Sequence, residues 1–386
     1  MQDRTVRNLK AGAEEIGVSV YRDWEQAGFF MFPSVGEYPV FDSTLYEYMI
    51  EDELRTEWYR TAVQRLAPGR TVLDIGTGAD AIWAIEGVRS GARHVYAMEV
   101  MPESAELARA AVARAGFTDR VTILEGLSTQ LSLPEPVDLC VSEIIGTISS
   151  SEGVAEVLHD ARKRFLKPGG RFIPHRSTST VAAVDLNRLP SPCLPALVEG
   201  SEGWLQNIFT DVGRPFDVRM CIFGITGETL LSGQAEVEPL EFNGELARSG
   251  TDHFELEVTT EGMLHGFALG VRLWVDETGE PIDSVQQLTN WPPLYAPIAQ
   301  DGIAVSPGDR IPLTFDWAPS DDGVHPDYRL SGELRPADGS EVMALEWDSP
   351  HHTAGFRGDD FYRELFPVSY GTPHPGRDER VATGSS

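Results

Sequence analysis

The feature that most constrains the fold is the apolar run 72–75, which contains Asp74 and is followed by Gly76 and Gly78. An apolar, β-branched stretch with two closely spaced glycines and then a helical pattern predicts a strand, a tight turn and a helix. Glycine lets the backbone pass close to a ligand where a Cβ atom would clash. Twenty-five residues after Asp74, a second apolar run ends in Glu99, an acid suited to the two hydroxyls of a ribose. The spacing predicts a nucleoside-binding βαβ unit; the alternative is a glycine-rich turn that binds nothing.

From about residue 70 to residue 174, short apolar runs alternate with helical patterns. Apolar strands joined by helices predict a parallel, doubly wound sheet, in which ligands bind at the carboxyl ends of the strands. The turn glycines, Glu99 and Glu143 all fall at such ends. After residue 177, short alternating runs bounded by Gly, Pro and Asp predict antiparallel β-structure, a barrel or a sandwich. The predicted fold class is therefore α/β plus β.

Four parts are expected along the chain. Residues 1–36 form an N-terminal arm, either a short strand pair or a cover for a ligand, and residues 37–176 form the doubly wound domain. Residues 177–371 form the antiparallel domain, interrupted at about 190–214 by a partly helical segment. Residues 372–386 are polar and rich in Gly and Pro, which predicts a flexible tail.

Two acids bracket one predicted loop. Glu143 ends a predicted strand, and Glu152 begins the next helix nine positions later. A loop between them can fold the carboxylates toward one another, and paired carboxylates can share a proton or clamp a planar cation. The alternative is structural: Glu152 favours the helix N-terminal dipole, and Glu143 is a strand-end acid.

Charge and composition narrow the partners. The chain has 60 acidic against 31 basic residues and a formal net charge of −29. Nonspecific nucleic-acid binding needs a basic footprint, so no nucleic-acid partner is expected, whereas an acidic field steers cationic substrates inward. The alternative is simply an acidic, solvated surface. The cysteines and the pair His351-His352 lack metal-ligand spacing, so no metal is expected. No signal peptide or membrane-length apolar run is found, which favours a cytoplasmic protein without a membrane partner.

Separated segments together resemble the protein arginine methyltransferase family. The helix pattern Met49-x-x-Asp52-Glu53-x-Arg55-Thr56-x-x-Tyr59, preceded by Tyr38-x-x-Phe41, is the specific part. The glycine turn with Glu99 follows, and then Ser142-Glu143 with Glu152, which resembles the family's double-E loop at its spacing. Farther on, Phe172-Ile173-Pro174 resembles the strand that closes the catalytic domain, and Leu288-Thr289-Asn290-Trp291 resembles the Thr-His-Trp loop. The resemblance is good from Tyr38 to Ile173 and patchy afterwards.

The resemblance implies a Rossmann-like methyltransferase domain, a C-terminal β-barrel, and a helical arm at 190–214 that makes a homodimer. The alternative for this segment is an amphipathic helix that packs on its own barrel. It implies S-adenosylmethionine as cofactor, with Arg55 on the methionine carboxylate and Met49 near the methyl group. The remaining implied contacts are Asp74, Gly76 and Gly78 at the turn, Glu99 on the ribose and Thr129 at the position of the family's adenine-contacting acid. Glu143 and Glu152 would be the catalytic residues that bind the methyl acceptor. Tyr38, Asn290 and Trp291 would bind the substrate.

Four departures from the family pattern leave three functions open. Asp80 replaces the third turn glycine, and Thr129 replaces the adenine-contacting acid. Residues 149–151 make a serine run in the double-E loop, and Asn290 replaces the loop histidine. The first function is N-methylation of an arginine or guanidine in a protein, peptide or free amino acid. The second is a small-molecule N-, O- or C-methyltransferase of specialised metabolism. The third is a non-catalytic binding module for the cofactor. The expected partner is a cationic or small-molecule methyl acceptor.

Overall fold

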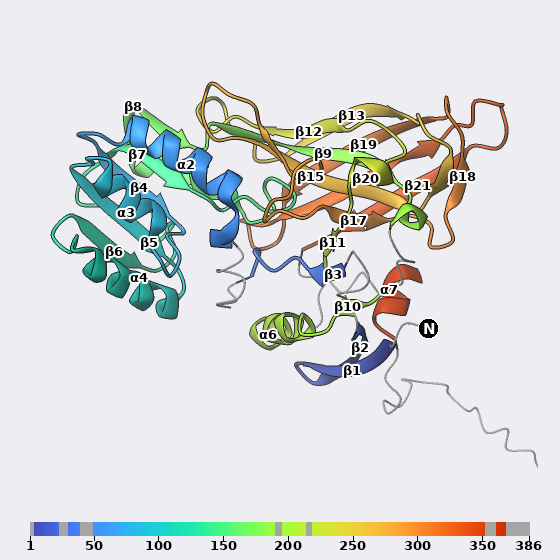
Figure 1. The fold of residues 1–386 in the computed structure, drawn as a ribbon, viewed down its shortest axis with the longest axis horizontal. Coiled ribbons are helices and arrows are strands. Elements are labelled where there is room, and N and C mark those ends of the chain that lie inside the picture. The colour runs from blue at the N-terminus through green and yellow to red at the C-terminus, as the bar shows by residue number, and fades with distance from the viewer. Residues whose placement is uncertain are drawn as a thin grey trace, which may run out of the picture.

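The computed structural model describes residues 4–22, 30–38, 49–189, 195–213, 218–351 and 360–367. Phe41, the predicted tail 372–386 and parts of the predicted arm, 190–194 and 214, lie outside the described residues. Figure 1 shows a parallel-sheet domain at the left, antiparallel strands at the upper right, and a third group of elements below them. Among the residues described, no helix has the length and apolar character needed to cross a membrane.

The first domain is the doubly wound sheet that the sequence predicts. Its parallel strands run in the order β6-β5-β4-β7-β8. They are β4 (Thr71–Ile75), β5 (His94–Glu99), β6 (Val121–Glu125), β7 (Val137–Ser142) and β8 (Leu166–Ile173). The helices are α2 (Glu53–Leu66), α3 (Ile82–Arg89), α4 (Pro102–Ala115) and α5 (Val154–Arg164). This order brings the ends of β4, β5 and β7 side by side, because β4 lies between the other two.

One strand of this sheet begins earlier than its sequence indicates. The run 167–170 contains a proline and two glycines and is typical of a helix stop, yet β8 starts at Leu166. Its register against β7 shifts, since Leu166 pairs with Val137 but Arg171 pairs with Leu139. An irregularity of this kind accommodates proline and glycine in an edge strand.

The second domain is built of antiparallel strands, in agreement with the α/β plus β prediction. Its largest sheet runs in the order β1-β2-β10-β3-β11-β17-β15-β9-β12, with β16 paired to β15. A second sheet runs β13-β19-β20-β21, and β14 pairs with β18. The main strands are β9 (Arg176–Val184), β12 (Ala235–Leu240), β13 (Gly250–Glu257), β15 (Gly266–Trp274), β17 (Leu294–Pro297), β19 (Arg310–Pro319), β20 (Pro326–Leu334) and β21 (Met343–Ser349). The shorter strands are β14 (Gly262–Leu264), β16 (Ile282–Asp283) and β18 (Ile303–Val305). One apolar core, which includes Val181, Phe267 and Phe315, joins both sheets.

The N-terminal segment is part of this second domain. β1 (Arg4–Ala11) and β2 (Glu14–Tyr21) form an antiparallel hairpin, and β3 (Phe30–Pro33) pairs with β11 (Met220–Phe223). β10 (Leu197–Val198) lies between β2 and β3. The strands β1, β2 and β3 therefore belong to the large sheet, and β3 finds its hydrogen-bonding partner far along the chain.

The helix of the predicted arm packs on its own chain. α6 (Glu202–Val212) buries Leu205, Ile208 and Phe209 in a core that also contains side chains of the β1–β2 hairpin and of α7 (Asp360–Leu365). Figure 1 places α6 and α7 on either side of β10, beside the hairpin. The apolar stripe that the sequence assigned to dimerisation is thus covered within the molecule.

Candidate functional site

The turn after β4 has a backbone that requires glycine. Gly76 and Gly78 have φ angles of 76° and 66°, in the left-handed region that side chains disfavour. The amide nitrogens of Gly76 and Thr77 donate to the Met98 carbonyl oxygen, at 3.0 and 3.1 Å. A Cβ atom on Gly76 would lie 2.9 Å from a methyl carbon of Ile144. The turn is therefore held tightly, with little room for a side chain.

Two buried acids support this turn. At the end of β5, Glu99 accepts hydrogen bonds from the amides of Gly78 and Met101, at 2.9 and 3.0 Å. Asp74 is fully buried and accepts from the Thr77 hydroxyl at 2.6 Å. Burial raises the pKa of Asp74 to about 7, although the hydrogen bond from Thr77 opposes the shift. Glu99 faces the cavity described below, whereas Asp74 lies beneath the turn.

Helix α2 brings an arginine to the same place. Asp52 caps its N-terminus, since one carboxylate oxygen accepts from the Arg55 amide at 3.0 Å. The other oxygen accepts from the Asn290 amide at 2.9 Å, which ties the helix to the second domain. The Arg55 side chain is only 2% exposed and donates to Glu143 and to the Met49 carbonyl oxygen. The spacing of the helix motif thus places Asp52 as the cap and Arg55 as the buried cation.

The loop from Glu143 to Glu152 is anchored in the second domain. The Trp291 indole nitrogen donates to the Ile145 carbonyl oxygen at 2.6 Å. Ile148 lies in the core between the two antiparallel sheets. The Ser149 amide donates to the Ser179 hydroxyl at 2.9 Å, and the Ser150 hydroxyl donates to Glu238.

The two loop acids are electrostatically unequal. Burial raises the pKa of Glu143, and the Arg55 guanidinium opposes the shift. The pKa of Glu152 lies well above its usual range, because burial and the negative charges of Glu143 and Glu37 all disfavour its ionised form. A cation, Arg55, therefore favours the ionised form of Glu143, whereas the nearby acids favour the protonated form of Glu152.

These residues line one cavity of about 330 Å³ between the two domains. Of the predicted site residues, it brings together Tyr38, Met49, Arg55, Gly76, Gly78, Glu99, Glu143, Glu152, Asn290 and Trp291. The second domain also contributes residues 32–36 and Cys221, and the turn contributes Asp80. The structure does not bring Thr129 into the cavity, because the turn after β6 leaves this side chain exposed to solvent. The contact of Thr129 with the cofactor therefore stays a prediction.

Glu238 is a buried acid that the sequence analysis missed. It lies in β12 at a register shift, with a φ angle of 53° and no exposed surface. Its carboxylate accepts from the hydroxyls of Ser150 and Ser179, the latter at 2.5 Å. Burial raises its pKa to about 7, against these hydrogen bonds. In an alternating strand a lone glutamate reads as an exposed residue, so no sequence signal marks it.

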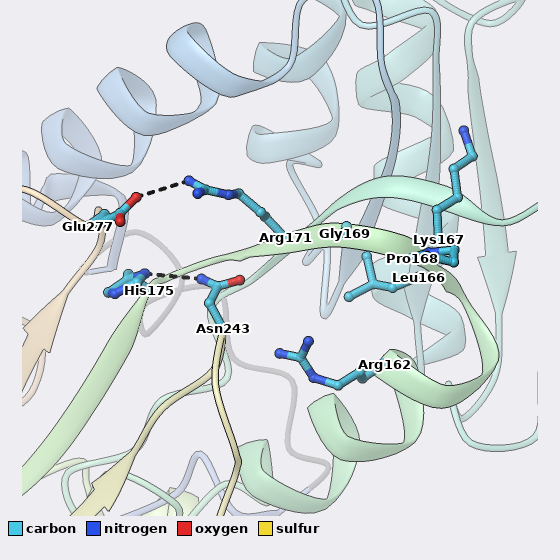
Figure 2. Close-up of a pocket in the computed structure, with 10 residues that line it drawn as sticks. Arg162, Leu166, Lys167, Pro168, Gly169, Arg171, His175, Asn243 and Glu277 are labelled. Atoms are coloured by element: carbon cyan, nitrogen blue, oxygen red, sulfur yellow. Dashed lines mark hydrogen bonds and ion pairs between the residues drawn. The ribbon is translucent and has the colours of Figure 1, made fainter.

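A larger cavity, of about 580 Å³, lies elsewhere (Figure 2). Its lining includes Arg162, the run 166–171, His175, Asn243 and Glu277, and none of the predicted site residues. Its cations are already engaged: Arg171 pairs with Glu277 at 3.2 Å, and Lys167 pairs with Asp138 at 2.7 Å. The smaller cavity, with its acids and glycine turn, is the candidate site.

Glu99→Gln is expected to weaken binding of a nucleoside cofactor by roughly 10- to 100-fold, the usual range for losing a charge-assisted hydrogen bond. The neutral amide would also accept less strongly from the Gly78 and Met101 amides, so the turn loosens. Calorimetric titration of the cofactor measures the effect, with Glu103→Gln as the matched control, since Glu103 is exposed on α4. Equal affinity in both variants would contradict the assignment of Glu99.

Comparison with known proteins points to one family. The family described as "Ribosomal protein L11 methyltransferase (PrmA)" matches residues 56–175. "Probable protein arginine N-methyltransferase 6" of Arabidopsis thaliana is 27% identical over 314 residues, 78% of this chain and 66% of that protein. The chain thus spans about two thirds of that relative's length. "Arginine N(omega)-methyltransferase" of Streptomyces achromogenes subsp. streptozoticus is 28% identical over 286 residues, 70% of this chain and 75% of that protein.

Solved structures show the same fold. Protein arginine methyltransferase 10 of Arabidopsis thaliana, at 21% identity, has a TM-score of 0.64 and covers 79% of this chain and 96% of its own. A chain of the Trypanosoma brucei PRMT1 enzyme-prozyme heterotetrameric complex with AdoHcy, at 18% identity, also has a TM-score of 0.64, covering 80% and 98%. With the glycine turn, the helix motif and the two loop acids in one cavity, the chain is similar to the protein arginine methyltransferases, and it is an S-adenosylmethionine-dependent methyltransferase.

Proposed function

We propose that the chain transfers a methyl group from S-adenosylmethionine to a nitrogen of a guanidinium acceptor, as in arginine. The observation that carries this proposal is the pair of glutamates, Glu143 and Glu152, that line one cavity with a single buried arginine, Arg55, among the residues that line it. Two carboxylates opposite one cation leave a negative site, which a monocation can neutralise.

The residues present fit the cofactor. The backbone at Gly76 and Gly78 is left-handed and lines the cavity, and a Cβ atom on Gly76 would lie 2.9 Å from Ile144, which also lines it. Glu99 lies at its edge, where ribose hydroxyls can share its carboxylate oxygens. Arg55 has a buried Nε with no hydrogen-bond partner among the described residues, so its guanidinium has donors to offer a carboxylate. When bound, the cofactor supplies a methyl group on a sulfonium sulfur, and transfer forms a nitrogen–carbon bond as the sulfur–carbon bond breaks.

The acceptor needs two things that this site offers. Two carboxylates that accept hydrogen bonds from a guanidinium draw its positive charge away from the attacking nitrogen. One of the carboxylates can also take the proton that this nitrogen loses. The Asn290 side-chain oxygen is buried with no hydrogen-bond partner among the described residues, so it can accept an N–H of the acceptor. These groups favour an acceptor rich in N–H donors over a neutral hydroxyl or carbon nucleophile.

Experiment decides the size of the acceptor, since one relative is named for arginine and the other for protein arginine. Methyl-labelled cofactor would be incubated with free arginine, an arginine peptide, an arginine-rich protein and lysine in place of arginine. Mass spectrometry should find the label on a guanidinium nitrogen and none on lysine. Label on a hydroxyl or carbon of another small molecule, with none on any guanidine, would contradict the proposal and support the small-molecule alternative.

Glu152 is expected to set the acid limb of activity. Its neutral form cannot pair with the acceptor cation, so kcat/KM should rise with pH through the raised pKa of this carboxyl. The folded protein favours the protonated carboxyl, so its contribution to stability is present at low pH and is lost as pH rises through the folded-state pKa. The difference in Tm between wild type and Glu152→Gln should therefore shift in favour of the variant as pH rises. A pH-independent difference would contradict the assignment.

We also propose that the chain works as a homodimer. The Trypanosoma brucei structure is titled a heterotetrameric complex, so related chains assemble. Since the apolar face of α6 is already covered by its own chain, a dimer must use another surface. Light scattering of the purified protein should give twice the chain mass of 42.4 kDa; a monomeric mass would contradict the proposal.

A further inference from the structure

The main chain at Gly36 lies directly against the second acid of the site. A Cβ atom built on Gly36 would lie 2.5 Å from the carboxyl carbon of Glu152, and closer still to one of its oxygens. Its φ angle is outside the left-handed region, so alanine is compatible with the backbone and is excluded only by Glu152. The neighbouring residues Pro33, Val35 and Tyr38 line the same cavity. The segment that follows β3 thus forms a wall of the acceptor side.

A buried ion pair holds this wall in place. Glu37 is 3% exposed, and its carboxylate pairs with Arg219 and lies 3.2 Å from Nδ1 of His351. Burial alone would raise the pKa of Glu37, but the charges of Arg219 and His351 lower it to about 2. The acid next to Gly36 is therefore ionised and compensated, unlike Glu152.

The partners of Glu37 are themselves fixed. Arg219 donates to the Ser349 hydroxyl at 2.8 Å and to the Pro326 carbonyl oxygen at 2.7 Å. Its guanidinium lies 4.7 Å from the centre of the Tyr328 ring, and the Tyr328 hydroxyl is 2.9 Å from that of Ser150. Arg219 therefore connects the wall to the loop that carries both catalytic acids.

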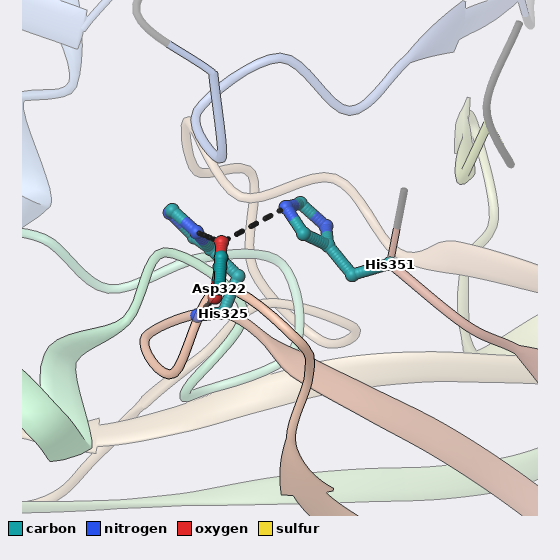
Figure 3. A group of neighbouring side chains, drawn as sticks. All are labelled: Asp322, His325 and His351. Carbon is teal, nitrogen blue, oxygen red and sulfur yellow. Dashed lines mark hydrogen bonds and ion pairs between the residues drawn. The ribbon is translucent and has the colours of Figure 1, made fainter. Parts of the chain in front are cut away.

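His351 braces the wall from its other side. Its ring stacks on Tyr38 with centroids 5.3 Å apart, and on His325 at 4.7 Å. Figure 3 shows Asp322 between the two histidines; it pairs with His325 at 2.6 Å and lies 3.7 Å from His351. These three side chains have atoms close enough to hold a metal ion, but the His325–Asp322 ion pair accounts for their arrangement without one.

We propose that Glu37 is a positioning residue and Gly36 a specificity-determining residue for methyl transfer: the Glu37–Arg219 pair presses the Gly36 main chain against Glu152 and fixes this carboxylate for the acceptor. The proposal rests on the proposed function, since Glu152 is assigned there to the acceptor. It follows that the acceptor site is built by both domains, and that a guanidinium reaches Glu152 only from the cavity.

Gly36→Ala is the direct test. The added methyl group must displace the Glu152 carboxylate, so kcat/KM for the acceptor should fall at least 10-fold while cofactor affinity stays within 2-fold. Gly233→Ala is the matched control, because a Cβ atom there meets nothing within 4 Å, and it should keep wild-type kinetics. Wild-type kinetics in Gly36→Ala, or an equal loss in both variants, would overturn the proposal.

Glu37→Gln tests the ion pair. The single change leaves Arg219 buried without its anion and is expected to lower Tm, so Glu37→Gln with Arg219→Gln, which removes both charges, is measured beside it. If Glu37 positions Glu152, the double variant should have a higher Tm than Glu37→Gln alone. Its KM for the acceptor, measured far below its Tm, should still exceed the wild-type value. If Glu37 serves stability alone, the acceptor KM returns to the wild-type value with the Tm, and the positioning role is overturned.

A structural readout separates this proposal from the proposed function. A crystal structure of Gly36→Ala with S-adenosylhomocysteine should show the Glu152 carboxylate moved by more than 1 Å from its wild-type position. This holds whether or not any guanidine is methylated. An unmoved carboxylate would overturn the inference even if wild type methylates arginine, whereas a moved carboxylate in a protein that methylates no guanidine would overturn only the proposed function.

Discussion

Glu143→Gln is expected to lower kcat by roughly 10²- to 10⁴-fold, the range associated with losing a positioned acid or base. Glutamine keeps the shape of the side chain but not the charge that draws positive charge away from the attacking nitrogen. In the free enzyme, Arg55 would also lose its ion-pair partner, so Tm should fall before cofactor is added. Cofactor binding should stay close to wild type, because the cofactor's own carboxylate can then pair with Arg55.

The control for this variant comes from the same sheet. Glu125 ends β6 as Glu143 follows β7, but it is exposed and pairs with Arg109 at the surface. Glu125→Gln should leave kcat and Tm near their wild-type values, since surface ion pairs contribute little. Single-turnover rates with saturating cofactor measure the chemical step. A rate for Glu143→Gln within 3-fold of the control would remove Glu143 from the mechanism.

The parallel domain could be predicted because its signals are local. The strand that holds Asp74, the glycine turn and the acid at Glu99 lie within 25 residues of one another, and each element has its own hydrophobic period. The parallel arrangement then places the strand ends together, so the acids of different strands meet without further information. The same logic located Glu143, and it is confirmed by the position of β7 beside β4.

The acceptor side could not be predicted in the same way. Glu37 and Arg219 are 182 residues apart, and the pair exists only because β3 and β11 are neighbours in the large sheet. Glu238 accepts a hydrogen bond from Ser150 across a domain boundary. It lies at a strand irregularity, where the register of β12 against β9 shifts. Contacts of this kind depend on tertiary packing, which local propensity does not encode.

Thr129 shows a different limit of sequence-based prediction, because it is assigned by its position in a motif rather than by its side chain. The family pattern aligns it with a contacting acid, but the turn after β6 leaves the threonine exposed and outside the cavity. A short side chain at that position also reaches less far than a carboxylate would. Alignment by spacing therefore transfers a backbone position, and the side chain decides whether the contact exists.

Arg55→Ala is expected to weaken cofactor binding by about 2–3 kcal/mol, the usual contribution of a charge-assisted pair, which is roughly 30- to 150-fold in Kd. It should also lower kcat, because Glu143 would remain buried without the cation that opposes its desolvation. The pKa of Glu143 would then rise further, and a protonated Glu143 cannot polarise the acceptor. The acid limb of kcat should therefore move to higher pH in the variant, and raising the pH should recover part of the loss.

Arg60→Ala is the matched control, since Arg60 lies on the same helix, is half-buried and lies within ion-pair distance of Glu57 and Glu86, outside the cavity. Arg55→Lys separates charge from geometry: lysine keeps a cation near Glu143 but cannot make a bidentate contact with a carboxylate. It should preserve the wild-type pH profile while retaining most of the loss in cofactor affinity. If Arg55→Ala and Arg60→Ala bind cofactor equally well by calorimetry, the buried arginine serves only to neutralise Glu143, and the cofactor carboxylate must be held elsewhere.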